Sequence, residues 1–198
     1  MKKWLVLSAL ALCVSSVAFA ADAPQMTKEQ QAMMDKMTKA ATPGPQHAML
    51  AKMAGEWNAV VKYQMDPSQP WQTSESTSTL TSLMDGRYCQ EVTSGQMMGG
   101  PFSGMGLTGY DNVSGKYVST WIDNFGTGIM TSTGTADASG KVIKWVGTMN
   151  DPVTGKATTE HMVTTIIDDD HHTFEMYGTP PNAKKEQKMM TIEYTRKK

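Results

Sequence analysis

Two pairs of side chains in this sequence have the types and spacing to hold a polar ligand group. Trp121 and Asp123 are two residues apart, and so are Tyr194 and Arg196. Residues two apart on a β-strand point to the same face of the sheet, so each pair presents an aromatic ring and a charge together. A guanidinium paired with a carboxylate keeps N–H donors for an anionic ligand group. The pattern predicts that the four residues line one cavity and that Arg196 pairs with Asp123.

Arginine is scarce in this chain, since only two of the 18 basic residues, Arg87 and Arg196, are arginines. The planar guanidinium suits carboxylates and also stacks on aromatic rings. We expect Arg87 and Tyr110 near the mouth of the cavity, as further ligand-binding residues. The alternative is a structural role, in which one of the two arginines packs over Trp57 at the closed end of the fold.

The sequence shows no known catalytic or metal-binding motif. The four histidines lack the spacing of a zinc site, and no nucleophile elbow, phosphate-binding loop or dinucleotide fingerprint occurs. His171 and His172 follow three aspartates. Adjacent residues on a strand point to opposite faces, so this pair favours a solvated hairpin over a metal site. We expect no enzyme activity and no bound cofactor or metal.

Methionine is unusually frequent, with 18 residues. The clusters Met33-Met34-Met37 and Met97-Met98 offer the soft sulfur ligands that Cu(I) prefers. The methionines spread along the chain without repeated close spacing, so packing of helix faces and of an adaptable cavity is the favoured interpretation. Cys89 is expected to be a buried, inert thiol.

The composition is that of a globular protein. The chain has 198 residues, of which 39% are hydrophobic, and 18 basic residues nearly balance 19 acidic ones. This length predicts one domain, or one domain with an appendage. The apolar content excludes a wholly disordered chain. A formal net charge of −1 argues against a nucleic-acid partner, because such binding needs a basic face.

Residues 1–20 have the pattern of a secretory signal peptide. Lys2 and Lys3 precede an apolar run, which ends in the small-x-small site Ala18-Phe19-Ala20. We predict cleavage after Ala20 and a periplasmic or secreted protein. The apolar run is short for a membrane anchor and no basic stop-transfer cluster follows it, so no transmembrane span is expected after cleavage.

Residues 21–45 are predicted to form a methionine-rich helical segment with a Pro/Gly linker. Thr27 and Gln30 fit a capping box at the start of a helix over residues 25–41, and Pro43-Gly44-Pro45 ends that helix. A second short helix is expected over about residues 47–53, with Gly55 closing it.

Residues 46–198 are predicted to form a β-barrel domain. After Gly55, apolar residues such as Trp57 and Ala59 alternate with polar ones, and nine turn signals divide the remaining chain into ten strand candidates. No long helical pattern interrupts the strands, so we expect them to be antiparallel and joined in sequence order. The expected fold class is mainly β: a roughly ten-stranded antiparallel barrel preceded by N-terminal helices.

A closed barrel of ten strands is too wide to be filled by its own side chains, so an internal cavity is predicted. Residues 73–79 include no large apolar side chain on either face. Such a strand suits the wall of a wet cavity or a rim. The alternative is a β-sandwich in which this strand faces solvent.

An ordered set of motifs resembles the bacterial domain-of-unknown-function family 1579 over roughly residues 46–198. The motifs are Leu50-x-x-x-x-Gly55-Glu56-Trp57, Asp85-Gly86-Arg87-Tyr88, Pro101-Phe102-x-Gly104, Gly109-Tyr110-Asp111, Lys116-Tyr117-Val118, Trp121-Ile122-Asp123, Asp151-Pro152-x-Thr154-Gly155-Lys156 and Tyr194-Thr195-Arg196. The resemblance implies a calycin-like barrel of the lipocalin or fatty-acid-binding-protein type. It implies no established activity.

The sequence supports two kinds of function. The first is non-catalytic binding of a small apolar or amphipathic ligand in the barrel cavity. The second is a structural or interaction protein of the bacterial envelope with a filled barrel, whose methionine-rich helix docks on a partner. The architecture is also similar to that of haem-binding barrels of the nitrobindin type, with His161 as the candidate axial ligand, although the face of its strand is undecided. The sequence leaves open whether copies of the chain form a homo-oligomer.

Overall fold

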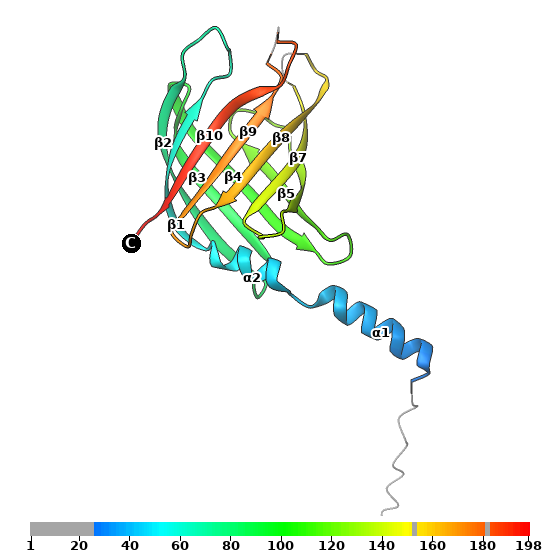
Figure 1. Cartoon of the computed structure of the whole chain (residues 1–198). Coiled ribbons are helices and arrows are strands. Elements are labelled where there is room, and N and C mark those ends of the chain that lie inside the picture. Colours follow the sequence, from blue (N-terminus) through cyan, green and yellow to red (C-terminus); the bar gives the residue numbers. More distant parts are fainter. Residues whose placement is uncertain (1–25, 152–153, 181–182) are drawn as a thin grey trace, which may run out of the picture. The chain divides into compact units, whose positions relative to one another are not determined.

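The computed structural model describes residues 26–151, 154–180 and 183–198 (Figure 1). The predicted signal peptide lies outside these residues. Helix α1 spans Lys28–Ala41 and α2 spans Pro45–Lys52. The predicted capping box of α1 is confirmed, because the Thr27 amide donates to the Gln30 side chain and the Gln30 amide donates to the Thr27 hydroxyl. The chain divides into two units between Lys36 and Met37, inside the residue range of α1.

Ten antiparallel strands follow the helices and close into a barrel in the order β1-β10-β9-β8-β7-β6-β5-β4-β3-β2 (Figure 1). The predicted fold class is therefore confirmed, and the sandwich alternative is wrong. The strands are β1 Gly55–Tyr63, β2 Gln72–Leu83, β3 Tyr88–Met97, β4 Gly100–Asp111, β5 Lys116–Asp123, β6 Met130–Ala136, β7 Val142–Asn150, β8 Ala157–Ile166, β9 His171–Gly178 and β10 Gln187–Arg196.

The two ends of the barrel differ. Helix α2 lies at the end where β1 begins and β10 ends, which we call the α2 mouth (Figure 1). The opposite end, where β1 and β5 end, is called the far mouth. Because consecutive strands alternate in direction, odd-numbered strands run from the α2 mouth to the far mouth and even-numbered strands run back.

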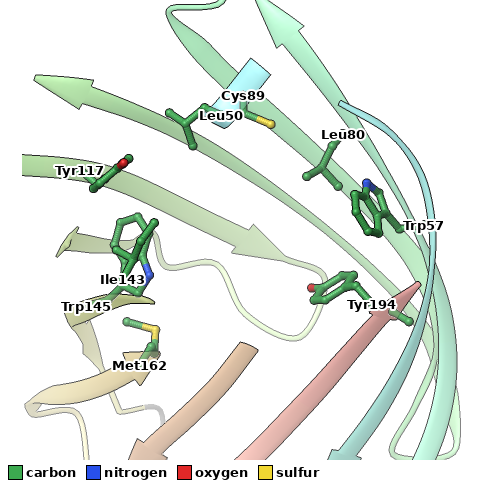
Figure 2. Close-up of a cluster of buried hydrophobic side chains, with 10 residues drawn as sticks. Leu50, Trp57, Leu80, Cys89, Tyr117, Ile143, Trp145, Met162 and Tyr194 are labelled. Carbon is green, nitrogen blue, oxygen red and sulfur yellow. The ribbon is translucent and has the colours of Figure 1, made fainter. Parts of the chain in front are cut away.

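The main apolar core lies in the half of the barrel next to the α2 mouth (Figure 2). Leu50 of α2 packs with inward-facing side chains of seven strands, namely Trp57, Ala59, Leu80, Cys89, Tyr117, Ile143, Trp145, Met162 and Tyr194. The indole N–H of Trp57 donates to the Met53 carbonyl at 3.0 Å, which ties the end of α2 to β1. Burial of this cluster is what fixes α2 against the barrel.

Glycines opposite the large rings give them room inside the barrel. A Cβ atom built on Gly104 would overlap the ring of Trp121, and one built on Gly134 would lie 2.6 Å from the ring of Trp145. Each glycine is on the strand next to its tryptophan. The indole rings therefore lie against bare backbone.

Arg196 closes the α2 mouth. Its guanidinium lies over the Trp57 ring at 4.2 Å and donates to the carbonyl oxygens of Ala54, Lys52 and Asp169 at 2.7, 2.9 and 2.8 Å. It joins the chain after α2 to the loop before β9 and to the end of β10. The expected structural role over Trp57 thus belongs to Arg196.

We predict that Arg196→Met lowers the free energy of unfolding by about 1.5–3 kcal/mol, because hydrogen bonds to a charged group are lost. Arg87→Met is the matched control. The partly exposed Arg87 guanidinium donates to the Met84 and Ala41 carbonyls at 3.1 and 3.3 Å and lies 3.8 Å from the exposed Asp85, so its loss should cost less than about 1 kcal/mol. Urea unfolding of both variants tests this, and equal losses would contradict the assignment.

Candidate functional site

The interior of the barrel changes character along its axis. Near the α2 mouth the inward-facing side chains are buried, as in the core described above. Towards the far mouth the interior is mixed. Val61, Tyr63 and Met97 form a second buried cluster, with Phe102, Met190 and Ile192 packed against it. Inward-facing side chains on the other side of the barrel, such as Trp121, Glu160 and Met176, are only half-buried, although the sheet around them is closed. This part of the interior therefore has accessible space, and we call it the open half. It is lined by Ser74, Ser76, Gly95, Phe102, Trp121, Met130, Glu160 and Met176.

A carboxyl group lies between the core and the open half. Glu91 is on the inward face of β3, two residues from the buried Thr93. Its Oε1 atom accepts hydrogen bonds from the Thr93 hydroxyl at 3.1 Å and from the Tyr194 hydroxyl at 3.3 Å. The Ser78 and Thr93 hydroxyl oxygens are 2.7 Å apart. Hydroxyl groups from β2, β3 and β10 thus converge on one carboxyl group.

Burial raises the pKa of Glu91 above its usual range, and hydrogen bonds from Ser78, Thr93 and Tyr194 oppose that shift. Burial is also the main cause that raises the pKa of Tyr194 well above 10, with the charge of Glu91 adding to it. Glu91 is half-buried as a whole residue and lies on the inward face of β3, so this residue lies at the edge of the open half.

Trp121 and Asp123 lie together at the far mouth, as their spacing predicts. The Trp121 indole N–H donates to Asp123 Oδ2 at 2.9 Å, and Asp123 Oδ1 accepts from the Phe125 amide at 3.0 Å. The Phe102 ring stacks near that of Trp121, with a centroid distance of 6.5 Å and an interplanar angle of 18°. The pair forms an aromatic wall of the open half that carries one carboxylate.

Tyr194 and Arg196 also share a face, but the predicted pairing of Arg196 with Asp123 is wrong. Asp123 ends β5 at the far mouth, whereas Arg196 ends β10 at the α2 mouth. The nearest carboxylate to Arg196 is that of Asp170, with 3.5 Å between Nε and Oδ1. Tyr194 lies between the two ends, with its hydroxyl on Glu91. The four residues therefore do not line a single small cavity.

Arg87 and Tyr110 lie at the α2 mouth, far from Trp121. Arg87 is half-buried in the β2–β3 turn and donates to the Met84 and Ala41 carbonyls. The Tyr110 ring packs against Tyr117 and His47 under α2, with centroid distances of 4.9 and 5.8 Å. Both contacts are structural, and the prediction that these two residues bind ligand stays a prediction.

Each end of the barrel carries a surface cavity. The larger, about 430 Å³, lies between α2 and the loops at the α2 mouth and is lined by residues that include Met49, Met53, Lys141, Asp168, His172 and Arg196. The smaller, about 260 Å³, lies under the β1–β2 loop at the far mouth, next to Tyr63 and Gln72. In the first cavity Arg196 is already bound to three backbone carbonyl groups, which favours a closing role for this residue.

The positions of His172 and His161 correct two expectations, that of a solvated His171-His172 hairpin and that of an axial ligand at His161. His172 is buried inside the barrel, against the rings of Tyr194 and Trp57 at centroid distances of 4.2 and 4.4 Å, so only His171 fits a solvated hairpin. Burial and then the nearby Arg196 charge lower the pKa of His172 to about 4. His161 is exposed on the outer face, where its Nδ1 lies 2.6 Å from Glu186 Oε1, so it cannot be an axial ligand inside the barrel.

Among the described residues no cluster of His, Cys, Asp and Glu is arranged to hold a metal ion. Cys89 is buried, as predicted, and burial followed by the charge of Glu91 raises the pKa of its thiol to about 12. No helix in the described ranges combines the length and apolar character that crossing a bilayer requires.

Glu91 is a candidate site residue that was not predicted from the residue patterns. Its signal is the alternation Cys89, Glu91, Thr93, in which an acidic residue occupies the inward face of a strand that is otherwise apolar or hydroxylic. The pattern alone does not show that hydroxyl groups from β2 and β10 surround this carboxyl group, because those contacts depend on strand register.

Residues 42–196 match the family model described as "Protein of unknown function (DUF1579)". The chain belongs to this family. The match covers the barrel, α2 and the residue before the Pro43-Gly44-Pro45 linker, and it leaves out all of α1. The resemblance found in the sequence motifs is therefore confirmed. A search of curated proteins gave no match.

Two solved structures share the fold of this DUF1579 member. Rv2717c from M. tuberculosis has 14% sequence identity and a TM-score of 0.60, over 79% of this chain and 100% of that one. The S-type phycobiliprotein lyase CPES from Guillardia theta has 8% identity and a TM-score of 0.53, over 76% of this chain and 92% of that one. At these identities the likeness is one of fold.

We predict that His172 makes the protein acid-sensitive. Its pKa falls from 6.5 in the unfolded chain to about 4 in the folded protein, so the unfolded state binds more protons between these values. Stability is then fully present above pH 6.5 and is lost as the pH falls towards 4, by up to about 3 kcal/mol.

His172→Phe keeps a ring against Tyr194 and removes the titrating group. The difference in unfolding free energy between pH 7 and pH 4.5, measured with urea, should be smaller for this variant than for the wild type. Glu91, whose raised pKa acts with the opposite sign, is present in both proteins and cancels in the comparison. An unchanged pH dependence would contradict the assignment.

Proposed function

We propose that this protein binds a small amphipathic molecule, without catalysis, in the open half of its barrel. The observation that carries the proposal is the combination of accessible space, apolar walls and a few placed polar groups inside one closed sheet. Ligand pockets in proteins have this composition.

The walls of the open half are divided by chemistry. Phe102 on β4 and Trp121 on β5 form an aromatic wall, and in the barrel order these strands face β9 and β10, which carry the inward-facing Met176 and Ile192. Phe102 and Ile192 also pack against the buried Val61, Tyr63 and Met97, so an apolar body would lie on the side of Trp121 and Met176. The polar end would reach Glu91 and its hydroxyl groups, which border the same space.

The reactive side chains in the barrel support a non-catalytic role. With a pKa near 12, the Cys89 thiol is protonated at neutral pH and is a poor nucleophile. With a pKa near 4, His172 is neutral, and in the described part of the chain its Nδ1 atom has no hydrogen-bond partner. A nucleophile with an adjacent base, as covalent catalysis requires, is not assembled from these groups.

A second candidate function rests on α1. The residues of this helix that the structure describes are all exposed, and the exposed fractions of Met33, Met34 and Met37 lie between 47% and 60%. Methionine-rich helix faces are typical of adaptable protein-binding surfaces. An envelope protein that docks through α1 is the alternative that the experiments below distinguish.

We predict that a small molecule copurifies with the protein. Native mass spectrometry after gentle purification should show a mass above that of the chain. Ser76→Phe places a ring in the open half and should abolish this added mass, whereas Thr77→Phe places the same ring on the outer face and should leave it. A chain without added mass, together with tight dimer or partner peaks, would favour the second candidate.

We also propose that the protein is exported, on the pattern of residues 1–20. Mass spectrometry of the protein from a periplasmic extract is expected to find Ala21 at the N-terminus. Cys13 lies inside the apolar run of this segment. A retained Met1 or a lipid-modified Cys13 would overturn this proposal.

A further inference from the structure

The charges that face the interior of the barrel are unequally distributed. Glu91, Asp123 and Glu160 occupy inward-facing positions on β3, β5 and β8. The inward-facing cation in the described strands is Arg196, at the α2 mouth, where backbone carbonyl groups and Trp57 hold it. His172 also faces inward, but its pKa of about 4 leaves it neutral at pH 7. The open half therefore has carboxyl groups without a cation beside them.

None of these three carboxyl groups has an ion-pair partner among the described residues. Glu91 contacts hydroxyl groups alone, and Glu160 Oε2 is buried without a hydrogen-bond partner. Asp123 is held by the Trp121 indole and a backbone amide, which leaves its negative charge uncompensated. A carboxylate removed from water costs free energy unless a cation or hydrogen-bond donors compensate it.

We infer that the ligand of the open half is a cationic amphiphile, whose protonated nitrogen pairs with Glu91 and whose apolar part lies between the aromatic wall and the opposite strands. The inference rests on the proposed binding function and names its ligand class. Asp123, at the far mouth, adds a negative charge on the entry path and favours the approach of a cation over that of an anion.

The chemistry around Glu91 fits an ammonium or amidine group better than a carboxylate. The Tyr194 and Thr93 hydroxyl groups already donate to Oε1, so they hold the carboxyl group in place without neutralising it. A second carboxylate placed there would repel Glu91 at short range. A protonated nitrogen would instead make a charge-assisted hydrogen bond in a site largely removed from water.

The inference predicts a preference among three ligands of equal chain length: decylamine, decanol and decanoate. Isothermal titration calorimetry with the mature protein at about pH 8, below the aggregation threshold of each ligand, compares them directly. Decylamine is protonated there, because the pKa of an alkylamine is close to that of lysine. We expect decylamine to bind most tightly, decanol less tightly and decanoate most weakly.

Glu91→Gln tests the counter-ion itself. The amide oxygen still accepts from Tyr194 and Thr93, and the cost of burying a charge disappears, so the variant should fold. It should weaken decylamine binding by about tenfold or more, in line with hydrogen bonds to charged groups. Decanol binding should stay within about twofold, since no ion pair is involved. Glu75→Gln removes the same charge from the outer face of β2 and should change neither affinity.

The pH dependence gives a second readout. The titratable groups that face Glu91 are Tyr194 on β10 and Cys89 on its own strand, and both have raised pKa values. His172 stacks on Tyr194, and its pKa is lowered to about 4. Glu160 on β8 faces the same open half, and burial raises its pKa too. Decylamine affinity should therefore increase with pH in the wild type and increase less in Glu91→Gln, where Glu160 still titrates.

The outcomes distinguish the cationic ligand class from the broader proposal that the barrel binds an amphiphile. Decanoate or decanol binding as tightly as decylamine, or an unchanged decylamine affinity in Glu91→Gln, would overturn the cationic ligand class and leave amphiphile binding in place. Failure of all three ligands to bind would contradict the proposed function as well.

Discussion

The pairing of β1 with β10 is the interaction on which the rest of the structure depends. Seven residue pairs from Trp57–Arg196 to Tyr63–Met190 join the first strand to the last and turn an open sheet into a barrel. Closure removes the unpaired strand edges, and it forces one face of every strand inward. Polar groups that an open sheet would present to water, such as the serines of β2 and the carboxyl group of Glu91, then share one enclosed space.

Closure also explains why the two halves of the interior differ. Helix α2 covers one end, and Leu50 with the aromatic rings beneath it fills that half. No comparable helix covers the far mouth in the described part of the chain. Glycines on β4 let Trp121 lie flat against the wall, so the ring narrows the open half without filling it. The polar groups around Glu91 therefore lie at the boundary between the buried core and the open half. At this boundary a carboxyl group can contact a bound ligand.

Much of the fold could be predicted from residue patterns, because turns and alternation are local. Thr27 and Gln30 form the expected cap, and the nine breaks separate the ten strands that the structure contains. The serine positions of β2 face inward, as a wet wall requires. Contacts between distant strands were harder. The position of His172 under Arg196 and the convergence of Ser78 and Tyr194 on Glu91 depend on register across the closed sheet, which no single strand specifies.

The failed pairing of Arg196 with Asp123 shows which part of the geometry strand parity leaves out. The alternation of side chains along a strand gives the face of the sheet on which a residue lies, and both residues do face inward. It does not give the position of a residue along the barrel axis. In a barrel of sequential antiparallel strands, height follows from strand number. The fifth strand ends at the far mouth and the tenth ends at the α2 mouth, so two residues at those ends lie a strand length apart. The same rule places Glu91 correctly: it is the fourth residue of β3 and faces the third-last residue of β10, Tyr194, across the two intervening strands. Applying face and height together makes Arg196 a closing residue and Glu91 the group that a ligand in the open half would meet.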